Sequence, residues 1–152
     1  MLTTRLVTIT EHLDAIWPLL EAHRAELATH PDIMPLEPQV DVYKSLEEQG
    51  KLLSLVLVHP EAGIVGYSVN IISHNLHYGP LLVCQNDVVF VDKTWRSEGG
   101  GALLMKATEI EARNRGCRMT LWHCKEGTQL HRMLRANPDY EVQDIVMSRV
   151  LR

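Results

Sequence analysis

Apolar positions recur along the chain with two periods that alternate from the first residues to the last. A short apolar and β-branched run at 5–9 predicts a strand. Over 10–30, leucine, isoleucine and tryptophan recur every three or four residues, which predicts a helix. Pro18 either kinks that helix or lies in its first turn, after a start capped by Asp14. A proline-rich loop at 31–39 and a short helix over 41–50 complete this part.

The rest of the chain alternates strands and helices. Apolar runs at 52–60 and 64–72 predict a hairpin, followed by a polar loop at 73–80 and a long strand at 81–91. A helix over 100–115, a strand at 117–124, a helix over 126–136 and a closing strand at 140–151 then follow. This order predicts one α/β domain spanning 1–152, a mixed central sheet flanked by helices, with a right-handed parallel crossover in its second half.

Three consecutive glycines at 99–101 stand at the start of a predicted helix, where glycine costs stability. Without side chains, successive N–H groups at a helix N-terminus can converge on an anion, and a positive φ is permitted. A flexible turn is the structural alternative. The following residues "ALL" lack the Lys-Ser/Thr pair of a Walker A loop, and the run lacks the third glycine of a dinucleotide fingerprint.

The same segment matches Arg-x-x-Gly-x-Gly, through Arg96, Gly99 and Gly101, and continues with Leu103 and Leu104. Preceded by the strand "DVVFV", it resembles the acetyl-CoA loop of the GCN5-related N-acetyltransferase (GNAT) superfamily. The predicted order of elements is similar to that family's over essentially the whole chain. The resemblance implies acetyl-CoA as co-substrate, no metal, and strands that splay apart at the acetyl-CoA site.

By this resemblance, the main chain of the glycine loop and of the preceding strand holds coenzyme A. N–H groups of the loop would bind the pyrophosphate, and the strand end would pair with the pantetheine amides and polarise the thioester carbonyl. The side chain of Arg96 either adds a charge near the phosphates or is simply solvated. The predicted cofactor-binding residues are Phe90, Val91, Arg96, Ser97, Glu98, Gly99, Gly100, Gly101 and Ala102.

Asp87 is the candidate base for acyl transfer to an amine. A lysine-like amine has a pKa near 10.4 and must lose a proton before it attacks. A carboxylate in an apolar strand is costly to bury unless it is paired or used, and several family members carry a glutamate near this place. A structural hydrogen-bonding role is the alternative. Strand alternation predicts Gln85, Asp87 and Val89 on one face, with Asn86 and Val88 on the other.

The general acid is less clear from the resemblance. Many family members use a tyrosine on the helix after the fifth strand, but that position falls near Leu134 or Arg135 here. His131, one turn earlier, is therefore the candidate acid, ahead of Tyr140. The thiolate could also leave without a dedicated proton donor.

The acceptor pocket is predicted from the polar loop at 73–80 and the start of the next strand. His74, His77 and Tyr78 are the candidate substrate-binding residues of the loop, and Gln85 is the candidate of the strand; a plain surface loop is the alternative. No third ligand with suitable spacing supports a metal site. His123 and Cys124 are adjacent on a strand and so point to opposite faces, which disfavours a Cys–His nucleophile.

Composition adds few constraints. The chain has 152 residues, 45% of them hydrophobic and 22% charged, as in a soluble globular domain. Its net charge of −4 disfavours nucleic acid as the main partner and favours a cationic small molecule or basic peptide. Three dispersed cysteines, and no signal sequence or long apolar run, predict a cytoplasmic protein without membrane attachment. Similar proteins are often dimers, so a homodimer is one expected state.

Taken together, the sequence predicts an acetyl-CoA-dependent N-acetyltransferase in which a primary amine attacks the thioester directly. The alternative is a catalytically weak GNAT-like module that binds coenzyme A or a protein partner. The acceptor loops carry no motif that identifies the amine.

Overall fold

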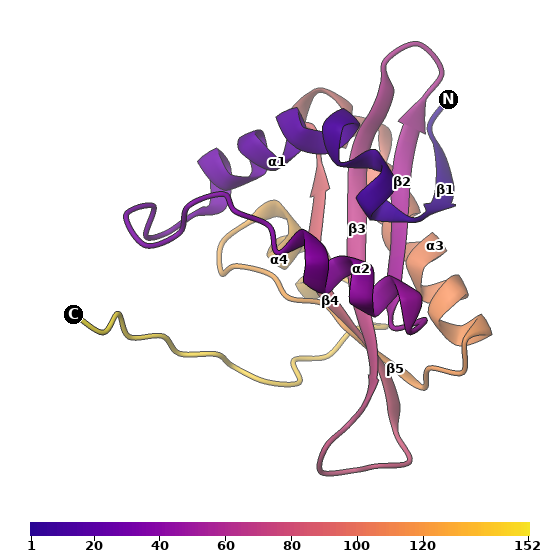
Figure 1. The fold of residues 1–152 in the computed structure, drawn as a ribbon, viewed down its shortest axis with the longest axis vertical. Coiled ribbons are helices and arrows are strands. Elements are labelled where there is room, and N and C mark those ends of the chain that lie inside the picture. The colour runs from indigo at the N-terminus through magenta and orange to yellow at the C-terminus, as the bar shows by residue number, and fades with distance from the viewer.

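A five-stranded mixed sheet forms the centre of the computed structural model, which describes all 152 residues (Figure 1). The strands lie in the order β1 (Thr3–Val7), β2 (Leu52–His59), β3 (Gly63–His74), β4 (Leu82–Val91) and β5 (Met119–Leu121). The first four pair antiparallel, and β5 pairs parallel to β4. The predicted single α/β domain with a mixed sheet is confirmed.

Helices cover both faces of the sheet. A 3-10 turn, η1 (Ile9–His12), leads into α1 (Leu13–Leu27), which packs with α2 (Val40–Glu48) on one face. A second 3-10 segment, η2 (Lys93–Glu98), leads into α3 (Gly100–Asn114), which packs on the other face. The last helix is α4 (Gln129–Ala136). Pro18 lies inside α1 rather than in its first turn. None of the helices is both long and apolar enough to cross a membrane.

Each face of the sheet has its own hydrophobic core. Leu53, Leu55 and Leu57 of β2 point toward α3, whereas Leu52 and Val56 point toward α1 and α2. A strand covered on both faces has no polar side, which explains why β2 reads as an almost continuous apolar run.

A β-bulge interrupts β4 at Asp87. Val88 pairs with Val69 and Asn86 pairs with Asn70, so Asp87 has no partner in β3. The extra residue reverses the alternation of side chains beyond it. The predicted alternation is therefore wrong past Asp87: Val89 packs in the α3-side core, and Val88 packs against the other.

Buried amide and hydroxyl groups hold the bulge in place. The Asn86 side-chain amide donates to Val88 O at 3.0 Å and to Asn70 Oδ1 at 2.9 Å. Asn70 in turn donates to Ser68 Oγ at 2.9 Å, and Thr108 of α3 donates to the same oxygen at 3.2 Å. The bulge is thus tied through side chains to β3 and to α3.

The predicted closing strand at 140–151 is wrong. Residues after Tyr140 belong to no helix or strand and form a tail that crosses the lower part of the molecule to its left edge in Figure 1. β5 is also shorter than predicted, because its pairing with β4 ends at Leu121 opposite Gln85. A strand needs a neighbour to pair with, and the tail has none beside it.

Candidate functional site

The sheet opens between β4 and β5. The two strands pair only from Val83 to Gln85, so the second half of β4 has a free edge on the side of β5. The Asp92 N–H donates to Val65 O at 2.9 Å, so the main-chain groups of Asp92 point toward β3. Main-chain N–H and C=O groups of successive residues point alternately toward and away from the neighbouring strand, so those of Val91 and Val89 face away from β3. Val91 O indeed accepts a hydrogen bond from Arg96 Nε at 2.8 Å. The free edge therefore presents Val89 and Val91.

This register corrects one predicted contact. Phe90 lies opposite Tyr67, and alternation turns its main-chain groups toward β3 rather than toward a ligand. Its side chain is buried and stacks on the imidazole of His23, with ring centroids 4.9 Å apart. Val89 takes the position at the free edge that Phe90 was expected to have.

The N-terminus of α3 lies just beyond the end of β4 and carries three free donors. Leu103 makes the first helical hydrogen bond, to Gly99 O at 3.0 Å. No carbonyl accepts the N–H groups of Gly100, Gly101 and Ala102. Such donors, at the positive end of a helix dipole, form a site that favours an anion.

The three glycines are there for three different reasons. Gly99 has φ of +76°, a left-handed conformation that favours glycine. A Cβ on Gly100 would lie 2.6 Å from Leu57 Cδ2, so this glycine lets α3 pack closely on the sheet. A Cβ on Gly101 would meet nothing within 4 Å. Neither packing nor backbone conformation requires a glycine at 101, which leaves open space beside the free N–H groups.

The side chain of Arg96 faces a protein partner instead of the helix N-terminus. Its two terminal nitrogens each lie 2.7 Å from a carboxylate oxygen of Glu26, and its guanidinium covers the ring of Phe90 at 5.2 Å. The paired guanidinium holds the pKa of Glu26 below its usual value. The Arg96 side chain is therefore paired rather than simply solvated and links η2 to α1, while its contact with a phosphate stays a prediction. Ser97 and Glu98 complete η2 and lead directly into Gly99.

Asp87 projects from the bulge and meets α2. The Tyr43 hydroxyl donates to Asp87 Oδ2 at 2.9 Å, across 44 residues of sequence. Burial, together with the negative charge of Asp87, raises the pKa of Tyr43 and keeps its phenol protonated. Asp87 itself is exposed, so its carboxylate is open to solvent and to a ligand.

A half-buried histidine interacts electrostatically with Asp87. His23 Nδ1 is 2.8 Å from the Tyr67 hydroxyl, and the ring stacks on Phe90. Burial lowers the pKa of His23, so the imidazole is neutral at pH 7. Tyr67 is completely buried, which raises the pKa of its phenol. Neither His23 nor Tyr43 was predicted, because both sit in ordinary amphipathic helices with no local motif.

The predicted acceptor residues are divided between two places. Gln85 Nε2 lies 3.1 Å from His123 Nε2, at the point where β4 and β5 separate. His74, His77 and Tyr78 belong to the loop at the far end of the β3–β4 hairpin. His74 pairs with Leu82, five residues before Asp87, which corresponds to about 16 Å of extended strand. Within one chain, the loop does not reach Asp87, contrary to expectation.

His131 lies in the first turn of α4. Its Nδ1 accepts the Gly127 N–H at 3.0 Å, and its own N–H donates to Thr128 Oγ1, the helix cap, at 3.3 Å. Only Nε2 remains for a proton-transfer role. The same loop reaches α1, because the Lys125 ammonium donates to Leu27 O.

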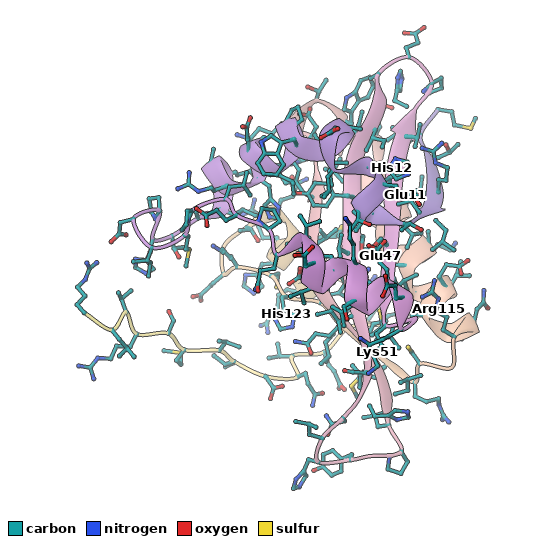
Figure 2. All side chains as sticks on the ribbon, in the orientation of Figure 1. Glu11, His12, Glu47, Lys51, Arg115 and His123 are labelled. Atoms are coloured by element: carbon teal, nitrogen blue, oxygen red, sulfur yellow. The ribbon has the colours of Figure 1, made fainter.

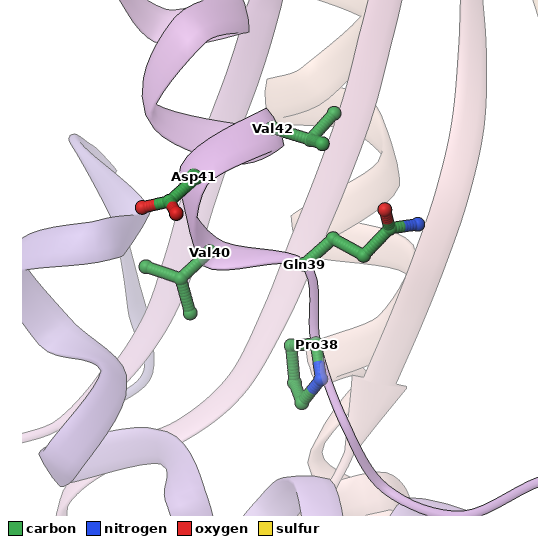
Figure 3. A pocket seen from close by; sticks show the side chains of 5 residues that line it. All are labelled: Pro38, Gln39, Val40, Asp41 and Val42. Carbon is green, nitrogen blue, oxygen red and sulfur yellow. The ribbon is translucent and has the colours of Figure 1, made fainter.

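Two hollows flank α2. One, of about 420 Å³, is lined by Pro38, Gln39, Val40, Asp41 and Val42 at the start of the helix, one residue before Tyr43 (Figure 3). The other, of about 570 Å³, is lined by Glu47, Arg115 and residues of β1, and His123 lies away from it (Figure 2). Neither hollow is lined by Asp87 or Tyr43.

No three His, Cys, Asp or Glu side chains come together in a way that could hold a metal ion. All three cysteines are free, and burial raises the pKa of each thiol, that of Cys84 to about 12. A catalytic thiolate at neutral pH has no support here.

Solved structures share this architecture over the whole chain. An aminoglycoside acetyltransferase from an uncultured soil metagenomic sample matches with a TM-score of 0.74 at 17% identity, covering 99% of this chain and 97% of its own. A ribosomal-protein-alanine N-acetyltransferase from Brucella melitensis biovar Abortus 2308 matches at 0.67 and 16%, covering 100% and 99%. Glucosamine-6-phosphate N-acetyltransferase from Arabidopsis thaliana matches at 0.69 and 12%, again covering 100% and 99%.

The chain has the GNAT acetyltransferase fold. No protein-family model matches its sequence, and no curated protein matches it by sequence either. The candidate site of this fold follows the chain along β4. It begins at the opening between β4 and β5, passes the bulge at Asp87 and ends at the glycines before α3.

Proposed function

We propose that this protein is an acetyl-CoA-dependent N-acetyltransferase that moves an acetyl group to a primary amine. The observation that carries the proposal is the set of free N–H groups at Gly100, Gly101 and Ala102, beside the open space at Gly101 and next to the free edge of β4. A diphosphate needs donors at close range with no side chain in the way, and these residues fit that need.

Coenzyme A would be held almost entirely by main-chain groups. The loop from Arg96 to Ala102 would bind the diphosphate, and the outward main-chain groups of Val89 and Val91 would pair with the pantetheine amides as an added strand does. Because Val91 O already accepts from Arg96, its N–H and both groups of Val89 are the ones left for this pairing. When bound, acetyl-CoA supplies an activated acetyl thioester and leaves as the free thiol.

Asp87 would prepare the amine. An alkyl ammonium has a pKa near 10.4, so it reaches the site protonated and must give its proton to a base or to water held by one. Tyr43 occupies Oδ2 of Asp87, which leaves Oδ1 for the acceptor or for that water. The same negative charge attracts the cationic amine before the proton leaves.

The acceptor class is a primary amine, favoured in a cationic form by the net charge of −4. The proteins with the same fold are named for aminoglycosides, glucosamine-6-phosphate and the alanine of a ribosomal protein.

Thiol release from acetyl-CoA, measured with a panel of amines, tests this function. The panel would contain sisomicin, glucosamine 6-phosphate and a peptide with an N-terminal alanine. Asp87→Asn should lower kcat/KM by about 10²- to 10⁴-fold, whereas Glu61→Gln, which removes a charge from the β2–β3 turn, should not.

The outcomes separate the proposal from its alternatives. Coenzyme A binding without thiol release on any amine would favour a binding module without turnover. Absence of coenzyme A binding at millimolar concentration would remove the proposal. Unchanged turnover of Asp87→Asn across pH would overturn the role given to Asp87 and leave acetyl transfer standing.

A further inference from the structure

Three buried side-chain oxygens have no hydrogen-bond partner, and all three lie on the side of the sheet that α2 covers. They are Oε1 and Oε2 of Glu47 in α2 and Oγ of Ser54 in β2. Leu53 and Leu55 point toward α3, so alternation turns Ser54 toward α2. The other buried polar residues are all hydrogen-bonded: Ser68, Asn70, Asn86 and Thr108. The unpaired oxygens are therefore a local exception that needs an explanation.

The Glu47 carboxylate is the costly member of this group. A carboxylate removed from water is stabilised only by a cation or by several hydrogen-bond donors. No ion pair of the structure includes Glu47, so neither Arg115 nor Lys51 neutralises it. Natural sequences keep such an unfavourable group mainly where it serves a function. A cationic group from outside the chain would supply the missing partner.

The hollow of about 570 Å³ beside Glu47 has a volume typical of small-molecule sites and contains a second charge. Arg115, at the end of α3 on the opposite face of the sheet from α2, also lines it (Figure 2). One terminal nitrogen of Arg115 donates to Leu52 O at 3.2 Å, and its other guanidinium N–H groups have no partner in the chain. Leu6, Val7 and Leu52 add an apolar wall.

We propose that this hollow binds a small zwitterion, an α-amino acid with an apolar side chain, at a site separate from Asp87. The ammonium group of the ligand pairs with the Glu47 carboxylate, and its carboxylate accepts the free N–H groups of Arg115. Its side chain packs against the apolar wall. Both oxygens of Glu47 are covered by neighbouring atoms, so the Glu47 side chain rotates about its own torsions when the ligand binds.

The two charges of the hollow favour a zwitterion over a simple ion. A ligand with only a positive charge is repelled by Arg115, and a ligand with only a negative charge is repelled by Glu47. Acetyl transfer plays no part in this inference, because neither Asp87 nor Tyr43 lines the hollow. Either proposal can therefore fail without the other.

Calorimetry on the full chain tests the site with L-leucine, L-methionine and L-phenylalanine as probes. At least one of them should bind at millimolar concentration or below. Its amide, which lacks the carboxylate, and its deaminated acid, which lacks the ammonium group, should each bind at least about tenfold more weakly. Absence of binding by all three amino acids would overturn the proposal, and so would an analogue that binds as tightly as its parent.

Substitutions locate the bound amino acid. Glu47→Gln and Arg115→Gln should each weaken binding at least about tenfold, because each removes one of the two charges. Glu48→Gln and Arg113→Gln, which change exposed neighbours in α2 and α3, are the matched controls and should leave binding unchanged. Asp87→Asn should leave it unchanged as well. Binding that is lost in Asp87→Asn but kept in Glu47→Gln would place the amino acid at the acetyl acceptor site and overturn the proposal.

Urea unfolding without any amino acid gives a second measurement. Because the Glu47 carboxylate is unpaired, Glu47→Gln should raise the urea midpoint, whereas the loss of a paired carboxylate lowers it. The amino acid that binds should raise the midpoint of the unmodified chain and leave that of Glu47→Gln unchanged. A lower midpoint for Glu47→Gln would mean that a cation of the chain, such as Lys51, neutralises the carboxylate in solution, and it would overturn the proposal.

Discussion

Replacing Asn86 with alanine should lower the stability of the fold and displace Asp87 with it. The Asn86 amide donates to Asn70 Oδ1 at 2.9 Å in the protein interior, and to Val88 O at 3.0 Å at a half-buried position. Its third contact, 3.4 Å to Val69 O, is long and adds little. A buried acceptor left without a donor costs about 1–3 kcal/mol, and a half-buried one costs about 1 kcal/mol, so losing both bonds should lower the free energy of unfolding by about 2–4 kcal/mol.

Urea unfolding of the alanine variant measures this effect directly. The midpoint should fall while the dependence on urea concentration stays unchanged, since the surface exposed on unfolding is nearly the same. Asn75→Ala is the control: the Asn75 side chain also makes two hydrogen bonds, accepting the N–H groups of His77 and Tyr78, but in an exposed loop, so its loss should cost less than about 1 kcal/mol. In acetyl transfer, Asn86→Ala should lower kcat more than it changes KM, because Asp87 is moved rather than removed.

Equal losses in the two variants would refute this reasoning. A change of less than about 0.5 kcal/mol for Asn86→Ala, within the range of ordinary surface substitutions, would mean that the bulge does not depend on the Asn86 amide. Full activity with lowered stability would mean that the bulge does not position Asp87.

Three further predictions concern the surroundings of the site. Because burial lowers the pKa of His23, the unfolded chain binds a proton below about pH 6.5 that the folded chain does not. The free energy of unfolding should therefore decrease as the pH is lowered below about 6.5, by up to about 1.4 kcal/mol per pH unit. His23→Gln should remove this part of the pH dependence when unfolding is measured at several pH values. Glu26→Gln should cost no more than about 1 kcal/mol at pH 7, since the Glu26 and Arg96 side chains are 26% and 25% exposed. The lowered pKa of Glu26 means that this contribution is present above about pH 4.5 and disappears as pH falls further, so a loss that persists at pH 2 would contradict it. Tyr43→Phe should lower kcat/KM about tenfold in the thiol assay by freeing Asp87 Oδ2, and an unchanged value would separate Tyr43 from catalysis.

Local periodicity predicted most of the fold. The apolar runs of β2, β3 and β4 and the amphipathic pattern of α3 are properties of consecutive residues, so they could be read in order along the chain. The free helix N-terminus before α3 was predicted as well, because three consecutive glycines are visible in the sequence itself. The three separate reasons for these glycines could not be predicted, since the contact of Gly100 with Leu57 depends on the packed sheet.

Features that depend on a partner strand were missed. The bulge at Asp87 exists because β3 offers one residue where β4 has two, and no pattern within "CQNDVVFV" reveals that offset. The C-terminal segment shows the converse: its apolar pattern fits a strand, yet no neighbour lies beside it in this chain. His23 and Tyr43 reach β4 only because α1 and α2 lie across the sheet.

Coenzyme A affinity of the Gly101→Leu variant tests the central claim most directly. Leucine is a better helix former than glycine, so in the first turn of α3, where a Cβ meets nothing within 4 Å, the change should raise stability by about 0.5–1 kcal/mol. The same side chain would fill the space in front of the free N–H groups, so calorimetry should show coenzyme A binding weakened at least about tenfold. Gly79→Ala, in the β3–β4 loop, should change neither quantity. A Gly101→Leu protein that is folded and binds coenzyme A as tightly as the unmodified chain would contradict the account.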